Sequence, residues 1–160
     1  MEKNIKDLFI HELHDILSAE RQIVEALPEM AAAAESSELK DAFSSHLVET
    51  KKQIQRLEQI FKLLKIEVKE KFCKGMRGLI QEGHDIIKDY EKSPVRDAAL
   101  ISGAQRIEHY EISAYGTLRT FAKEIELEET VADLLQTTLD EEGSADKKLT
   151  RIAEGGLLRT

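Results

Sequence analysis

The chain is poor in the residues that crosslink a fold or interrupt its helices. Its 160 residues include one cysteine, two prolines, eight glycines and no tryptophan. Because the single cysteine, Cys73, cannot form an internal disulfide, we expect a reducing, cytoplasmic setting. Few helix breakers, together with much Leu, Ala, Glu and Lys, are typical of an all-α protein.

Basic residues and long apolar runs are also scarce. The chain has 23 basic and 31 acidic residues, which give a formal net charge of -8. This balance disfavours a nucleic-acid partner, which usually requires a basic face, and it also disfavours an anionic membrane surface. The opening residues, MEKNIKDLF, show no signal peptide, and we find no stretch long enough to span a bilayer. The length predicts a single domain over residues 1–160.

Apolar residues recur at helical spacing in four long segments. We expect long helices over residues 5–34, 38–64, 94–123 and 130–153. Pro28 lies inside the first segment and predicts a kink or a break near Ala26, because proline lacks the N–H that a helix interior requires. Gly155 and Gly156 are expected to end the last helix.

One connection is much longer than the other two. Residues 65–92 contain a charged stretch, KEKFCKG, followed by a short amphipathic segment at 76–90. Ser93 and Pro94 then form a typical helix start, with a cap residue before a first-turn proline. Since short links make neighbouring helices antiparallel, a single long crossover predicts a ferritin-like antiparallel four-helix bundle with a short extra helix in the crossover.

Each long helix also places an acidic side chain on or beside its apolar face. The polar residues at these positions are Glu20 on the first helix, His46 and Glu49 on the second, Glu108 and Glu111 on the third, and Glu142 and Asp146 on the fourth. Pairs three or four residues apart share one helix face. Several carboxylates facing one another in a dry core repel strongly, whereas iron or manganese ions accept carboxylates and an imidazole as ligands. Because the helix-bundle template for a dinuclear carboxylate site needs such residues on all four helices, the pattern predicts two iron or manganese ions per chain.

The ligands are expected to have different roles. We expect bridging by Glu49 and Glu142, terminal ligation by Glu20, His46, Glu108 and Glu111, and weaker or indirect contact by Asp146. Tyr115 is either a hydrogen-bond donor to these ligands or an ordinary core residue. Glu141 next to Glu142 leaves open which of the two faces the core.

Each polar residue alone is also compatible with a solvated charge. A non-catalytic structural bundle, with its carboxylates paired to Arg21, Arg106 or Lys52, is therefore the alternative function.

Four segments of the chain resemble the YciE/YciF-type family of ferritin-like proteins. They are LFIHELHDILSAERQIVEALPEMA, FSSHLVETKKQIQRLEQIF, ISGAQRIEHYEISAYGTLRTFA and LLQTTLDEEGSADKKLTRIA, which together cover all four long helices. The resemblance implies a ferritin-like bundle with an extra crossover helix, a homodimer and a role in bacterial stress responses. The wide apolar arc of residues 38–64 also favours a dimer. A more distant likeness to rubrerythrin, carried by Glu108-x-x-Glu111, implies diiron ligands on the third helix.

The ligand pattern differs from that of rubrerythrin on two helices. His46-x-x-Glu49 reverses the usual order, and Lys52, three residues further on, cannot ligate a metal. The fourth helix has Ala145 where a histidine would follow Glu142. An oxygen-rich site favours ferric iron or manganese, and it weakens the case for rubrerythrin-type peroxidase or ferroxidase activity. Whether the protein is an enzyme is left open, with oxygen or peroxide as the candidate substrate.

The resemblance also bears on partners. The chain has no rubredoxin-type cysteine pair, so an electron donor would be a separate protein. A DNA-compacting miniferritin is disfavoured by the charge balance. An iron-storing cage is disfavoured by the amphipathic crossover segment, which predicts a different outer surface.

Overall fold

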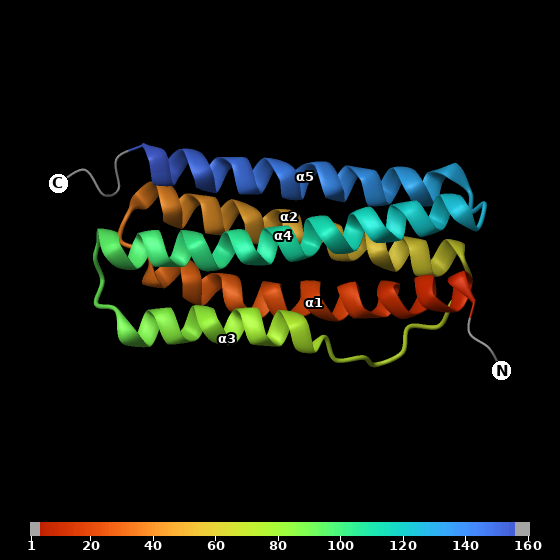
Figure 1. The fold of residues 1–160 in the computed structure, drawn as a ribbon, viewed down its shortest axis with the longest axis horizontal. Coiled ribbons are helices and arrows are strands. Elements are labelled where there is room, and N and C mark those ends of the chain that lie inside the picture. The colour runs from red at the N-terminus through yellow and green to blue at the C-terminus, as the bar shows by residue number, and fades with distance from the viewer. Residues whose placement is uncertain (1–3, 156–160) are drawn as a thin grey trace.

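The computed structural model describes residues 4–155, which form five α-helices without any strand. The helices are α1 (Ile5–Ala33), α2 (Ser37–Leu63), α3 (Lys74–Asp89), α4 (Pro94–Glu124) and α5 (Glu129–Glu154). Figure 1 shows four long helices lying side by side, with α3 outside them against α1 and α4. The predicted all-α ferritin-like bundle is confirmed.

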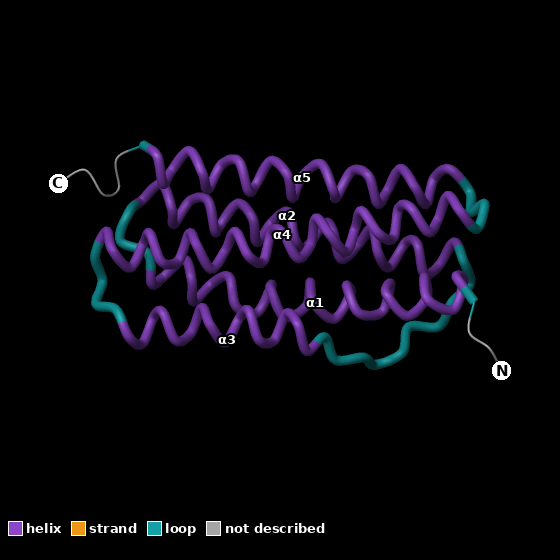
Figure 2. The backbone as a smooth tube through the Cα atoms, viewed as in Figure 1, coloured by secondary structure: helices purple, strands orange, loops and turns teal. Residues whose placement is uncertain are grey.

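The connections have the predicted lengths. The links between α1 and α2 and between α4 and α5 are a few residues each, and they join antiparallel neighbours. The loop that follows α2 is the longest one in Figure 2, and together with α3 it returns the chain to the opposite end of the bundle. As a result α2 and α4 run in the same direction, which is the ferritin-like arrangement.

Side chains cap the starts of three of the long helices. The Asn4 side chain accepts a hydrogen bond from the Asp7 N–H, and the Asp7 carboxylate accepts one from the Asn4 N–H. Ser36 and Ser93 cap α2 and α4 in the same way. Such caps satisfy backbone donors that have no partner inside the helix. Pro94 stands in the first turn of α4, so the predicted start of this helix is confirmed.

One expectation about helix interruption needs correction, and another is confirmed. The predicted break near Ala26 is wrong, because α1 continues as one helix of 29 residues through Pro28. Leu27 and Met30, on either side of the proline, are both buried, and their packing compensates for the missing backbone hydrogen bond. The expected end of α5 at Gly155 is confirmed, although this residue has φ −69° and does not use the left-handed conformation that favours glycine. Gly156 lies outside the described residues.

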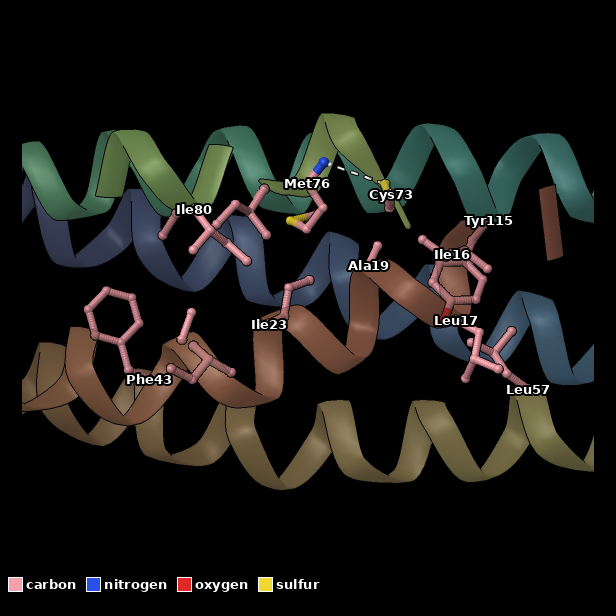
Figure 3. Packing of buried hydrophobic residues seen from close by; sticks show 14 of the residues in the cluster. Ile16, Leu17, Ala19, Ile23, Phe43, Leu57, Cys73, Met76, Ile80 and Tyr115 are labelled. Carbon is pink, nitrogen blue, oxygen red and sulfur yellow. Dashed lines mark hydrogen bonds between the residues drawn. The ribbon is translucent and has the colours of Figure 1, made fainter. Parts of the chain in front are cut away.

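An apolar core runs the length of the bundle. Its largest fully buried side chains include Phe9, Leu13, Ile16, Leu39, Leu57, Phe61, Leu100 and Tyr115. Burying one large apolar side chain contributes about 1.5–3 kcal/mol. Met76 and Ile80 of α3 join this core, as Figure 3 shows, so the crossover helix covers one side of the bundle. Tyr90, the last residue of the amphipathic segment predicted at 76–90, is 46% exposed because the helix ends at Asp89.

A buried carboxylate ties α4 to the turn between α1 and α2. Asp97, in the first turn of α4, is wholly buried. Its two oxygens accept hydrogen bonds of 2.7 Å from the N–H groups of Glu35 and Ser36. Hydrogen bonds to a charged acceptor are stronger than neutral ones, so this contact fixes the relative positions of three long helices at one end.

None of the helices within residues 4–155 is long and apolar enough to cross a membrane.

Candidate metal centre

All four long helices bring a buried polar side chain to the middle of the bundle. These residues are Glu20 on α1, His46 on α2, Glu108 and Glu111 on α4, and Glu142 on α5. Each lies among apolar neighbours at helical spacing, so the packing that buries the core also buries these groups. The sequence predicted all five positions.

Four of these side chains converge on one point. His46 Nε2 lies 3.3 Å from Glu108 Oε1, 4.0 Å from Glu111 Oε2 and 4.0 Å from Glu142 Oε2. One ligand atom from each of the four residues lies within 4.8 Å of the other three. Neighbouring ligands of an ion with bonds of about 2.1 Å are separated by about 3 Å. Small side-chain rotations therefore suffice to place all four on one cation.

Most polar atoms of this cluster are buried without a hydrogen-bond partner. They are Glu20 Oε2, Glu108 Oε2, both ring nitrogens of His46, and both carboxylate oxygens of Glu111 and of Glu142. An unsatisfied buried polar atom costs about 1–3 kcal/mol, and folded proteins contain few of them. Their concentration at one place fits the donor set of a metal ion, which would satisfy several of them at once.

Without a cation, the cluster retains protons. Burial, followed by the negative charge of Glu142, raises the pKa of Glu20 to about 8. Burial and contact with Glu142 also raise the pKa values of Glu108 and Glu111 well above the ordinary glutamate range. For His46, burial acts to lower the pKa, but Glu49 and the charges of Glu142 and Glu20 outweigh it and the net pKa is raised. Metal binding must therefore displace protons.

Tyr115 holds Glu20 in position. The Tyr115 hydroxyl donates a hydrogen bond to Glu20 Oε1, while Glu20 Oε2 has no partner. Burial and the neighbouring Glu20 charge raise the pKa of Tyr115 well above its usual value, so the phenol stays protonated as a donor. Of the two alternatives for Tyr115, the structure shows the hydrogen-bond donor, with the candidate ligand Glu20 as acceptor, and it leaves the second Glu20 oxygen free.

Replacing Tyr115 by Phe is expected to weaken metal binding by about 10-fold to 100-fold, the usual effect of removing a hydrogen bond that orients a ligand. The substitution keeps the ring and removes only the hydroxyl that orients Glu20. Competition titration with a chromophoric chelator measures the affinity. Tyr90→Phe, at an exposed tyrosine, is the control and should leave the affinity unchanged. Equal affinity in both variants would show that the hydroxyl does not support the site.

Three predicted ligands lie outside the four-residue cluster: the buried Glu20, and also Glu49 and Asp146. The Glu49 side chain is 44% exposed, and its Oε2 lies 3.7 Å from His46 Nδ1. Glu49 thus lies near Nδ1 of His46, whereas Glu108 faces Nε2. A carboxylate at the second ring nitrogen sets the orientation of an imidazole that ligates a metal. Asp146 accepts a hydrogen bond from Gln105 and lies 3.3 Å from Nε2 of the exposed His109. Asp146 is therefore engaged at the outer contact of α4 with α5.

The structure resolves which of two adjacent glutamates faces the core. Glu142 is wholly buried in the cluster, whereas Glu141 lies on the flank of α5. Arg56 donates hydrogen bonds of 2.6 and 2.7 Å to the two Glu141 oxygens. Gln53 also donates to Glu141, and Arg56 donates to Thr138 Oγ1. Sequence reasoning missed this polar network. The signal available in the sequence was the place of Gln53 beside the apolar face of α2, three residues before Arg56.

Two of the three cations named in the structural alternative pair with surface carboxylates. Arg21 pairs with Glu58 at 3.6 Å, and Arg106 pairs with Glu82 at 3.6 Å. Both pairs lie at the surface, where an ion pair contributes little to stability. Neither arginine neutralises the buried carboxylates.

Comparison with known proteins places the chain in a family. Residues 4–160 match the family described as Domain of unknown function (DUF892). The chain is 45% identical over 152 residues to Protein YciF of Escherichia coli (strain K12), covering 94% of this chain and 91% of that protein.

Solved structures agree with this match. The crystal structure of the E. coli stress protein YciF has a TM-score of 0.94 at 43% identity, over 99% of this chain and 100% of that one. YcfI from Rhodopseudomonas palustris, described as a candidate structural protein, has a TM-score of 0.89 at 41% identity, over 92% and 94%. A Xanthomonas campestris protein at 18% identity shares the fold, with a TM-score of 0.75. This chain belongs to the DUF892 family and is similar, over nearly its whole length, to the stress protein YciF.

Proposed function

We propose that this protein is a stress-associated ferritin-like protein that holds two iron or manganese ions in the core of its bundle. The observation that carries the proposal is the cluster of buried, unpaired ligand atoms supplied by all four long helices. This arrangement follows the template of dinuclear carboxylate sites in helix bundles. The stress association rests on the similarity to YciF, which is described as a stress protein.

The positions of the side chains suggest how two ions would be shared. His46 and Glu108, which lie 3.3 Å apart, would hold one ion. Glu20, with one oxygen bonded to Tyr115 and the other free, would hold the second. Glu111 and Glu142 have both oxygens buried and unpaired, so they suit the bridging positions. In this arrangement Glu111 takes the bridging role expected of Glu49, and Glu49 orients His46.

Iron or manganese bound here would supply one-electron redox chemistry toward oxygen or peroxide. The residues of the chain would provide the surroundings for that chemistry. The core shields the site from bulk water, since Glu20, Glu111 and Glu142 are wholly buried. Exclusion of water strengthens electrostatic interactions within the site. The raised pKa values of Glu20 and Glu111 make these two carboxylates proton acceptors when the metal leaves and proton donors when it binds. An external protein would supply electrons.

A non-catalytic structural role is the second candidate. It is favoured by the similarity to YcfI, which is described as a candidate structural protein. The raised pKa values of Glu20, Glu108 and Glu111 also support it, because protonation neutralises these carboxylates without metal. A bundle of this kind would be as stable in chelator as in iron.

Thermal unfolding separates the two candidates. A ligand that binds only the folded state at 100 times its Kd stabilises that state by about 2.7 kcal/mol. For a domain of this size the corresponding rise in melting temperature is about 5–10 °C. We expect a rise of this size when chelator-treated protein receives ferrous iron or manganese without oxygen, followed by circular dichroism. Magnesium at the same concentration is the control. Identical melting curves in chelator, manganese and iron would support the structural role.

We also propose a homodimer. The outer surface of α2 carries exposed apolar side chains, including Val48 and Leu63, which a second copy would cover. Sedimentation velocity should give twice the 18.1 kDa mass of the chain. A monomer or a large multimer would contradict this proposal. A cytoplasmic location and an external electron donor stay predictions.

A further inference from the structure

A cavity of about 200 Å³ lies directly beside the candidate metal centre. Its walls are mostly apolar and come from all five helices, with Ile23, Leu27, Phe43, Ile80, Ile107 and Leu149 among them. Figure 3 shows Ile23, Phe43 and Ile80, from α1, α2 and α3, directed toward the same part of the interior. His46 and Glu108 form part of the same wall. A molecule in the cavity would therefore touch one edge of the metal cluster.

Small side chains create this space. Ala26 of α1, Ala42 of α2, Ala104 of α4 and Ala145 of α5 all line the cavity. Larger apolar residues at these positions would bring the core to the close packing that is normal for protein interiors, where few voids exceed a water molecule. A void of this size next to a cluster of ligand atoms indicates a binding site.

The cavity has a route to solvent between α2 and α5. Its exposed lining residues are Ser45 on α2 and Ser144, Lys148 and Arg151 on α5. The half-buried Glu49 also lines the cavity, so its charged lining outside the core combines this acidic group with Lys148 and Arg151, in contrast to the apolar walls inside. A ligand would thus place its apolar part inside, against His46 and Glu108, and any polar end at Lys148 and Arg151.

We propose that the cavity binds a small, largely apolar organic molecule of one aromatic ring or a short aliphatic chain. The volume sets the size, since an engineered apolar cavity of about 150 Å³ binds benzene. The composition of the wall sets the polarity, because an apolar lining does not compensate a charged group for its lost hydration. The inference that this molecule is a substrate rests on the proposed metal site. Its binding depends on the cavity alone.

Titration of chelator-treated protein with benzene, indole and 1-hexanol tests the cavity without the metal. We expect at least one probe to bind with a Kd below about 1 mM and to raise the melting temperature. Binding should perturb the nuclear magnetic resonance signals of His46. Failure of all three probes to bind the wild-type protein at this concentration would overturn the proposal.

Two cavity-filling variants and one matched control locate the binding. Ala26→Leu fills the cavity from α1, and Ala145→Leu fills it from α5; neither residue is a candidate ligand. Ala32→Leu makes the same change at an exposed position of α1. Each filling variant that folds, as judged by circular dichroism, should weaken probe binding at least about 10-fold, with Ala32→Leu unchanged. Undiminished binding in folded filling variants would place the probe elsewhere and overturn the proposal.

The two proposals can fail separately. Probe binding without metal binding would leave the cavity inference standing and remove the metal centre. Metal binding without probe binding would leave the metal centre standing and overturn the cavity inference.

Discussion

Replacement of Glu142 by Gln is expected to abolish metal binding while leaving the bundle folded. Glu142 is wholly buried, and both its oxygens lack partners. A neutral amide of the same shape is a weak ligand for iron or manganese, so we expect the affinity to fall by more than about 100-fold. Because the charge of Glu142 raises the pKa values of Glu20, Glu108 and Glu111, the substitution should also stabilise the metal-free protein at pH 8.

Glu141→Gln is the matched control, because it makes the same chemical change one residue away. Glu141 faces Arg56 at the flank of α5 instead of the cluster. Loss of this partly exposed ion pair should lower the free energy of unfolding by about 1 kcal/mol or less and leave metal affinity unchanged. Isothermal titration with manganese compares the variants. Equal loss of affinity in both, or no loss in Glu142→Gln, would refute the assignment of Glu142 as a ligand.

The metal-free protein should lose stability as the pH rises from 5 to 8. Glu20 has a pKa of about 8 in the folded protein and 4.5 ordinarily, so within this window the folded state binds more protons than the unfolded state. The contribution of Glu20 to stability is therefore greatest below pH 4.5 and falls as the pH rises toward the folded pKa. His46 acts in the same direction, because its pKa is also raised. Each such group contributes a slope of up to about 1.4 kcal/mol per pH unit.

Bound metal should reverse this dependence. Metal ligands must be deprotonated, so manganese should stabilise the protein more at pH 8 than at pH 5. Urea unfolding at pH 5, 6.5 and 8, in chelator and in manganese, gives both profiles. The Glu142→Gln variant should show a shallower fall in chelator, because it removes a charge that raises the pKa of Glu20. If the stability of the metal-free wild type stayed flat or rose with pH, the pKa values of Glu20 and His46 would not be raised as described.

The helices and their order could be predicted because they depend on periodicity and link length. The long crossover between α2 and α4 was sufficient to distinguish the ferritin-like connectivity from a simple up-down bundle. The break expected near Ala26 was wrong, since the backbone preference of Pro28 was considered without the packing of Leu27 and Met30. The segment predicted at 76–90 extends one residue beyond the end of α3 at Asp89, because this end carries no strong sequence signal.

The candidate site could be predicted in part, for reasons of helix geometry. Glu20, Glu111 and Glu142 lie on the centre line of an apolar face, and side chains there point to the bundle axis. Glu49 is three residues after His46, which is about 60° short of a full turn at 3.6 residues per turn. When His46 points inward, Glu49 therefore lies on the flank. Which residue of such a pair faces the axis depends on the packing of neighbouring helices, and one sequence does not reveal it.

The metal content of the purified protein tests the central claim most directly. Plasma mass spectrometry would be applied after anaerobic reconstitution with ferrous iron or manganese and a chelator wash. The proposed site predicts about two ions per chain in the wild type, from the dinuclear template, and none retained by Glu111→Ala. Near-zero retention by the wild type with both metals would contradict the metal centre and favour the structural role.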